Sequence, residues 1–245
     1  MEWTDDAVVL SVRPHGESAA ILETLTRLHG RHLGLVRGGA SRRTRPVLQP
    51  GNALHLHWRA RLGDHLGSFT AELVKARAGD MLDSREALAG LNAFSAVASA
   101  ALPEREAHAG LFEAADILLD AMRLSDFAHW GALYVRWEAG LLEELGFGLD
   151  LTRCAATGAL ENLIYVSPRT GRAVCGDAGA LYKERLFALP GFLLGSQNAS
   201  PDAADVLAGL KLTAHFLAER VLRPHGKDMP QARLRLDGLA NRESH

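Results

Sequence analysis

Apolar and polar residues alternate along the first 80 positions in the manner of β-strands. Leu54, Leu56 and Trp58 are separated by polar residues, as in a strand with one buried face. Similar short runs, bounded by glycine-containing turns, occupy 8–12, 19–26, 32–37 and 69–76. Five short strands with such turns are what a small closed barrel of the OB-fold type requires.

From Ser84 onward the apolar residues recur at helical spacing instead. Stripes of this kind run over 88–102, 111–122, 130–145 and 206–221. Pro103 suits the first turn of the second helix, Asp126 is expected to cap the third, and Pro224 to stop the fourth. The predicted fold is therefore α+β, with an OB-type barrel at residues 1–80 and an α-helical bundle at 81–245.

An irregular segment at 151–180 interrupts the helical pattern. It holds both cysteines, Cys154 and Cys175, and its sequence predicts a hairpin turn at 167–171. The segment after Met229 is polar, and we expect it to fray.

The composition is that of an ordinary soluble protein. The hydrophobic content is 47% and the mean hydropathy is −0.03, and no apolar run is long enough to span a membrane. The first six residues are acidic and lack the pattern of a secretory signal, so we expect a cytoplasmic protein with reduced cysteines.

The charge distribution is more informative than the net charge of −2. The stretch from Thr24 to Gly63 contains no Asp or Glu, a common feature of segments that bind polyanions. Its arginines are the candidate nucleic-acid-binding residues: Arg27, Arg31, Arg37, Arg42, Arg43, Arg45, Arg59 and Arg61.

Two parts of this stretch suggest how nucleic acid could be held. Residues 38–45 are predicted to form a flexible basic loop, and guanidinium groups bind phosphate oxygens in a forked geometry. Arg59 and Arg61 fall on the polar side of a strand, next to Trp58, which is either a stacking platform for bases or a core residue. The competing interpretation is a solvated charged face.

The remaining polar residues do not form a catalytic or metal-binding pattern. His29 with His32, and His55 with His57, are pairs without the further ligands that a zinc site needs. The barrel histidines could add positive charge beside the arginines as the pH falls. Walker, dinucleotide-binding and nucleophile-elbow motifs are absent, so we predict no catalytic residue, no cofactor and no metal.

Several segments of the chain resemble the RecO family of DNA-repair proteins. The most specific similarity covers residues 28–39 and continues through 41–51. Residues 13–17, 165–171 and 233–236 also fit the family, in the right order along nearly the whole length.

The resemblance implies an OB-fold followed by a helical domain with a zinc-finger-like insert. It also implies binding to single-stranded and double-stranded DNA, annealing of complementary strands, and work with RecR to load RecA onto DNA coated by the single-stranded-DNA-binding protein. The C-terminal tail of that binding protein is an expected partner, and the expected location is the cytoplasm, in association with the nucleoid.

The insert departs from the family pattern at its metal ligands. Many relatives carry a Cys-x-x-Cys pair on each side of it, whereas Thr157 and Ala178 stand here at the second position of each pair. Two thiolates cannot complete a tetrahedral zinc shell, so we expect that the metal is lost and the hairpin retained.

The leading hypothesis is a recombination mediator without catalytic activity. The alternative is an RNA-binding OB-fold protein that acts as an assembly factor, and a small hydrolase ranks third. Annealing of single-stranded DNA, against binding of structured RNA, separates the first two.

Overall fold

The computed structural model describes residues 1–195 and 200–243. The chain divides into two compact units, residues 1–124 and 125–245. The first contains a β-barrel followed by α-helices, and the second contains α-helices, shorter helical segments and a small three-stranded sheet. No helix in the described part of the chain is long and apolar enough to cross a membrane.

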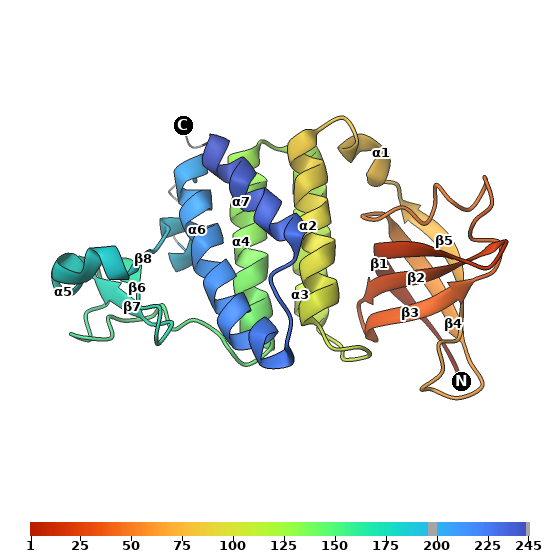
Figure 1. Ribbon diagram of the computed structural model, residues 1–245, viewed down its shortest axis with the longest axis horizontal. Coiled ribbons are helices and arrows are strands. Elements are labelled where there is room, and N and C mark those ends of the chain that lie inside the picture. Colours follow the sequence, from red (N-terminus) through yellow and green to blue (C-terminus); the bar gives the residue numbers. More distant parts are fainter. Residues whose placement is uncertain (196–199, 244–245) are drawn as a thin grey trace. The chain divides into compact units, whose positions relative to one another are not determined.

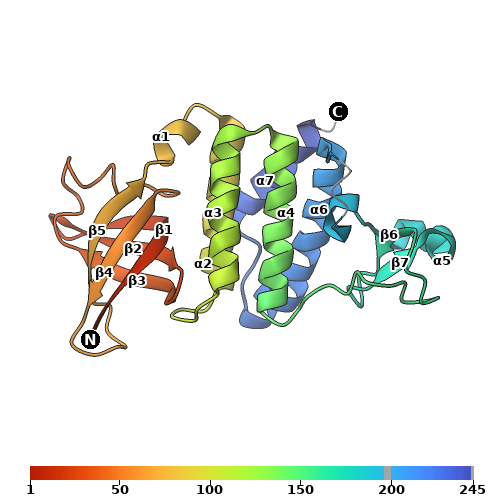
Figure 2. The same ribbon diagram turned by 180° about the vertical axis from the view of Figure 1, so that it is seen from behind.

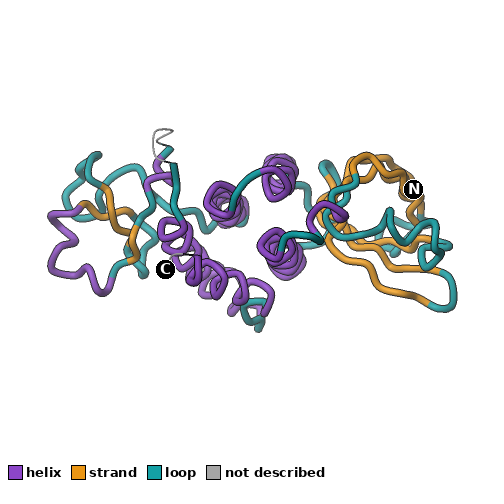
Figure 3. The backbone as a smooth tube through the Cα atoms, turned by 90° about the horizontal axis from the view of Figure 1, so that it is seen from above, coloured by secondary structure: helices purple, strands orange, loops and turns teal. Residues whose placement is uncertain are grey.

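Five strands form the closed barrel of the first unit: β1 (Glu2–His15), β2 (Ala19–Thr26), β3 (Gly30–Val36), β4 (Ala53–Arg59) and β5 (Ser68–Lys75). Their order is β1-β2-β3-β5-β4, and the long β1 pairs with both β2 and β4. The barrel closes where β3 meets β5 in parallel, at Leu35 and Ser68. Figures 1 and 3 show the ribbon curling back on itself. This confirms the predicted OB-type barrel.

Side-chain alternation explains why these segments are strands. In β4 the residues Leu54, Leu56 and Trp58 are buried, and the polar residues between them are exposed. Because side chains alternate with a period of two, these apolar residues all point into the barrel. Burial of their apolar surface stabilises the fold by about 25 cal/mol per Å². Leu22 of β2 and Val36 of β3 complete this core.

The helices of the first unit are α1 (Ala78–Met81), α2 (Arg85–Ala101) and α3 (Ala109–Leu124). Ser84 caps α2 by accepting a hydrogen bond from the Ala87 N–H at 3.1 Å. Pro103 does not begin α3, contrary to the prediction, because the segment 102–108 runs against β3 instead, where the Arg105 N–H donates to the Arg31 carbonyl.

The second unit is built on α4 (Phe127–Glu144), α6 (Ala203–Phe216) and α7 (Gln231–Glu243). A π-helix at Leu217–Leu222 and a 3₁₀ turn at Arg223–His225 continue α6. As predicted, Asp126 caps α4, accepting from the His129 N–H at 2.9 Å. Figure 2 shows α4, α6 and α7 from behind.

The described part of the segment after Met229 forms the helix α7, and there the expectation that it frays is wrong. Residues 244–245 lie outside the described residues. In α7 the residues Leu236, Leu239 and Ala240 are buried. Arg233 is fully buried as well, and its guanidinium pairs with Glu138 of α4 at 2.6 Å. A few buried apolar residues and the buried Arg233–Glu138 ion pair therefore hold this helix. The sequence pattern does not reveal this ion pair.

The insert is a small sheet with short helices. Its strands β6 (Leu163–Val166), β7 (Ala173–Cys175) and β8 (Phe187–Ala188) lie in the order β7-β6-β8. The predicted turn is present, since Gly171 N–H donates to the Ser167 carbonyl at 2.9 Å. Short helical segments follow at α5 (Gly176–Gly179), Ala180–Arg185 and Gly191–Leu194.

Candidate nucleic-acid interface

The basic loop, residues 37–51, joins β3 to β4 and consists of hydrogen-bonded turns. Ser41 organises its first turn, because its hydroxyl oxygen accepts from the Thr44 N–H at 3.2 Å. The Arg45 N–H donates to the Ser41 carbonyl at 3.0 Å. The Ala40 N–H donates to the Ser18 carbonyl at 3.1 Å, which ties the loop to the β1–β2 turn.

Two buried residues anchor the far end of this loop. Leu48 is fully buried in the barrel core. The Asn52 amide nitrogen donates to the carbonyls of Pro46 and Val47 at 2.9 and 3.0 Å. Residues 38–45, predicted to be a flexible loop, are thus tied to the barrel by hydrogen bonds, and the loop is anchored at Leu48. A loop anchored in this way loses less entropy on binding.

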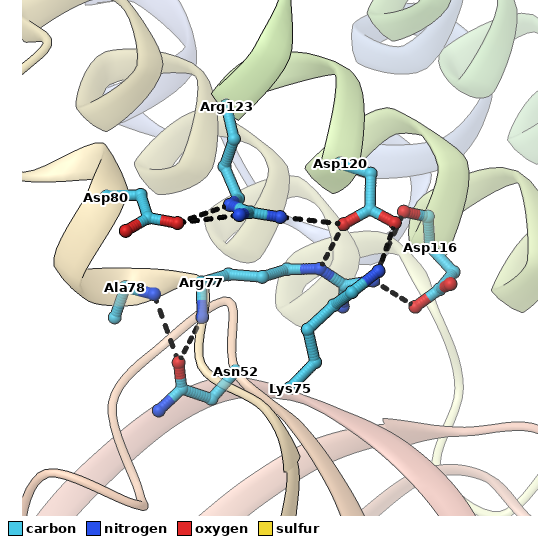
Figure 4. Close-up of polar contacts among 8 residues, drawn as sticks. All are labelled: Asn52, Lys75, Arg77, Ala78, Asp80, Asp116, Asp120 and Arg123. Carbon is cyan, nitrogen blue, oxygen red and sulfur yellow. Dashed lines mark hydrogen bonds and ion pairs between the residues drawn. The ribbon is translucent and has the colours of Figure 1, made fainter.

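The Asn52 amide also fixes the exit from the barrel. Its carbonyl oxygen accepts from the backbone N–H groups of Arg77 and Ala78 at 2.9 and 3.0 Å, as Figure 4 shows. One side chain thus joins the basic loop to the segment between β5 and α1. Sequence reasoning missed this residue, since a single Asn after a glycine is indistinguishable from an ordinary turn residue.

Six of the eight candidate arginines are exposed and have no ion pair or side-chain hydrogen bond within the described residues: Arg37, Arg42, Arg43, Arg45, Arg59 and Arg61. Arg37 and Arg59 line one polar groove with a volume of about 560 Å³. Thr44 from the basic loop and Ser68 and Thr70 from β5 line it too. These hydroxyl and guanidinium groups are hydrogen-bond donors suited to phosphate oxygens.

Arg27 and Arg31 are placed differently from these six. Arg27 pairs with Glu113 at 2.6 Å. Arg31 keeps only 13% of its side chain exposed and pairs with Glu23 at 2.7 Å, while its Nε donates to the Leu102 carbonyl at 2.8 Å. The structure brings these two arginines to acidic partners of the same unit rather than to the groove.

Trp58 is a core residue and not an open stacking platform. It is 2% exposed, and its indole N–H donates to the Leu66 carbonyl at 3.1 Å. Gly67 is required beside it, because a Cβ there would lie 2.3 Å from the indole nitrogen. Trp3 stacks on Trp58 and, on its other side, on His29 at 4.1 Å between ring centroids.

The barrel histidines lie beside acidic groups. His55 is 2.9 Å from Asp6, and His57 is 3.9 Å from Glu2. Burial lowers the pKa of His32, whose Nδ1 lies 2.9 Å from the Leu33 carbonyl. The exposed imidazoles of His55 and His57 therefore each have a carboxylate as a neighbour.

A second polar cluster joins β5 to α3 (Figure 4). Arg77 is 1% exposed, and its guanidinium pairs with Asp116 at 2.5 Å and Asp120 at 2.9 Å. Asp120 also accepts from Lys75 at 2.6 Å. Burial raises the pKa of Asp120, but the hydrogen bonds from Arg77 and Lys75 outweigh it and lower this pKa from 3.8 to about 2. The sequence signal that could have revealed this cluster is the spacing of Asp116 and Asp120, which are four residues apart on a predicted helix.

The two cysteines of the insert are free thiols that lie side by side. The Cys175 N–H donates to Cys154 Sγ at 3.2 Å, and both side chains are buried. Burial raises the pKa of Cys154, but hydrogen bonds from Thr157 and from backbone N–H groups outweigh it and lower this pKa from 9.0 to about 6. Within the described residues no three or more His, Cys, Asp or Glu side chains gather as metal ligands. That the protein binds no metal ion stays a prediction.

Comparison with known proteins places the chain in a family. A family model described as "Recombination protein O N terminal" matches residues 1–77, and one described as "Recombination protein O C terminal" matches residues 82–229. A "DNA repair protein RecO" of Cereibacter sphaeroides is 55% identical over 99% of both chains. Proteins of the same name from Rhodospirillum centenum and Caulobacter vibrioides are each 52% identical, over 96% and 98% of this chain and 93% and 98% of their own.

The barrel and the groove define the class as an α+β protein with an OB-type barrel that carries a polar groove lined in part by arginines. Within that class the chain belongs to the RecO family of DNA repair and recombination proteins.

Proposed function

We propose that this chain is a non-enzymatic recombination mediator that binds single-stranded and double-stranded DNA through its barrel. The observation that carries the proposal is the set of six exposed arginines without acidic partners, defined above, two of which, Arg37 and Arg59, line one polar groove. Unpaired guanidinium groups release counterions from a phosphate backbone without reading its sequence. Arg27 and Arg31 serve the fold in this proposal, because acidic side chains already neutralise them.

Strand annealing follows from the same charge. Two complementary strands repel each other through their phosphates, and screening by a shared set of cations lowers that barrier. No covalent step is needed, and we assign no catalytic residue.

Partners are proposed from family membership. We expect the chain to act with RecR in loading RecA onto DNA coated by the single-stranded-DNA-binding protein, and to contact the C-terminal tail of that protein. The expected location is the cytoplasm, with the nucleoid. The barrel at 1–80 would bind DNA, and the helical part at 81–245 would make the contacts with partner proteins.

Strand annealing tests the proposal. Complementary oligonucleotides are mixed with the full chain, with and without the single-stranded-DNA-binding protein and RecR, while affinities for single-stranded DNA and a structured RNA are measured by anisotropy. We expect faster annealing and tighter binding to the DNA. Tight binding to the RNA without annealing would favour an RNA-binding assembly factor and overturn the proposal.

A further inference from the structure

The basic loop contributes residues to two hollows of different chemistry. The polar groove is lined by Arg37, Thr44 and Arg59. A second, mostly apolar recess of about 370 Å³ is lined in part by the next loop residue, Arg45. Neighbouring positions of one loop therefore face a polar site and a separate apolar one.

Apolar side chains form most of the recess, and its floor is part of the barrel. Leu48 and Ala20 are buried core residues, and Val12 and Pro14 of β1 line the recess as well. Gly39 lets the loop lie close to β2, since a Cβ there would be 2.7 Å from the Ala20 Cβ. The recess is thus formed by a well-anchored backbone and does not depend on exposed side chains alone.

Two polar groups stand at this recess. Arg45 is exposed and has no ion pair within the described residues. The Gln49 side chain donates its amide N–H to the Arg45 carbonyl at 3.0 Å, which leaves its carbonyl oxygen as an acceptor. A mostly apolar recess whose lining also includes an arginine and a glutamine suits a heterocyclic base, which has apolar faces and polar groups at its rim.

We propose that this recess accepts one unstacked base of a bound single strand, while the polar groove holds phosphate groups. The inference rests on the proposed function. The charge of the six arginines supports a nucleic acid as the source of the occupant. These arginines draw a polyanion to the loop that lines part of the recess. The volume is within the range of ligand sites, about 300 Å³ and above. The apolar walls and the Arg45 guanidinium take the place of aromatic side chains as the surface for the base.

Strands with and without bases test this inference. Affinities of the full chain for an oligothymidylate and for an abasic strand of the same length are measured at one salt concentration. Each base that is stacked contributes several-fold or more to affinity, so we expect about tenfold tighter binding of the base-bearing strand. The variant Ala40→Leu narrows the recess from the loop side. It should bring the ratio of the two affinities, oligothymidylate over abasic strand, towards one, and the affinity for the abasic strand should stay unchanged.

Controls separate this inference from the proposed function. Ala159→Leu, at an exposed position of the second unit, should keep the wild-type ratio. Pro14→Leu, in the β1 part of the lining, replaces Ala40→Leu if that variant does not fold. Equal affinity of wild type for the two strands, or a ratio of affinities that the folded recess variant leaves unchanged, overturns the base site while DNA binding stands. Failure to bind either strand overturns the proposed function.

Discussion

The buried cation of Arg77 offers a quantitative test of how β5 is joined to α3. Arg77→Met keeps the apolar stem and removes the guanidinium that pairs with Asp116 and Asp120. Breaking a fully buried pair costs about 3–5 kcal/mol. The two carboxylates here are 42% and 27% exposed, and Asp120 keeps Lys75. We therefore expect a loss of about 2 kcal/mol in the unfolding free energy at pH 7.

The pKa of Asp120 adds a pH signature to this prediction. A fall from 3.8 to about 2 corresponds to at most about 2.4 kcal/mol, at 1.36 kcal/mol per pH unit, and solvent screening reduces it to about 1–2 kcal/mol. Because the folded-state pKa is depressed, this stability is complete above about pH 4 and is lost as the pH falls towards 2. In the variant the pKa of Asp120 returns towards 3.8, so the difference between the two proteins should shrink to about 1 kcal/mol at pH 3.

Urea unfolding of the full chain at pH 7, 5, 4 and 3, followed by the fluorescence of its four tryptophans, measures this difference. Arg235→Met is the matched control, since Arg235 is exposed and has no ion pair within the described residues. A difference below about 0.5 kcal/mol at pH 7 would refute the structural role of Arg77. A difference that is the same at pH 7 and pH 3 would refute the coupling to Asp120.

Three further predictions concern the second unit and its separation from the DNA-binding face. Arg233→Met should lower the unfolding free energy by about 3–5 kcal/mol in urea titrations, because Glu138 is left buried without its cation, and a loss below about 1 kcal/mol would contradict this. Elemental analysis should find no stoichiometric zinc, since Thr157 and Ala178 stand where ligands are needed, and a full equivalent of tightly bound zinc would overturn it. The folded variant Arg42→Ala/Arg43→Ala/Arg45→Ala should still bind the tail peptide of the single-stranded-DNA-binding protein in calorimetric titration, and parallel loss of peptide and DNA binding would show that the two sites overlap.

The barrel could be predicted from sequence because its signal is local. Alternation in β4 puts Leu54 and Leu56 inside, and β2 begins and ends where the apolar run does. Asp126 and Ser84 were recognisable as boundaries, since a capping side chain acts on the next few residues.

The candidate site was only partly predictable because charge neutralisation is not local. The stretch 24–63 contains no acid, yet Glu113, 86 residues beyond Arg27, pairs with it, and Glu23 lies just outside the stretch and pairs with Arg31. Counting charges along the chain cannot reveal such partners. The helix α7 escaped prediction for the same reason, because Arg233 is buried through a carboxylate 95 residues away.

The central claim is that the unpaired arginines of the barrel hold the phosphate backbone, and the salt dependence of single-stranded DNA affinity tests it most directly. The variant Arg42→Ala/Arg43→Ala/Arg45→Ala is compared with Arg169→Ala/Arg185→Ala/Arg235→Ala, which removes the same charge from exposed positions of the second unit. Each lost phosphate contact reduces the slope of log affinity against log salt by about 0.7. We predict that the barrel variant, still folded, loses at least about 1.4 from the slope, which is the share of Arg42 and Arg43, and that the control keeps the wild-type value. An unchanged slope in the barrel variant, or an equal loss in both, would contradict the account.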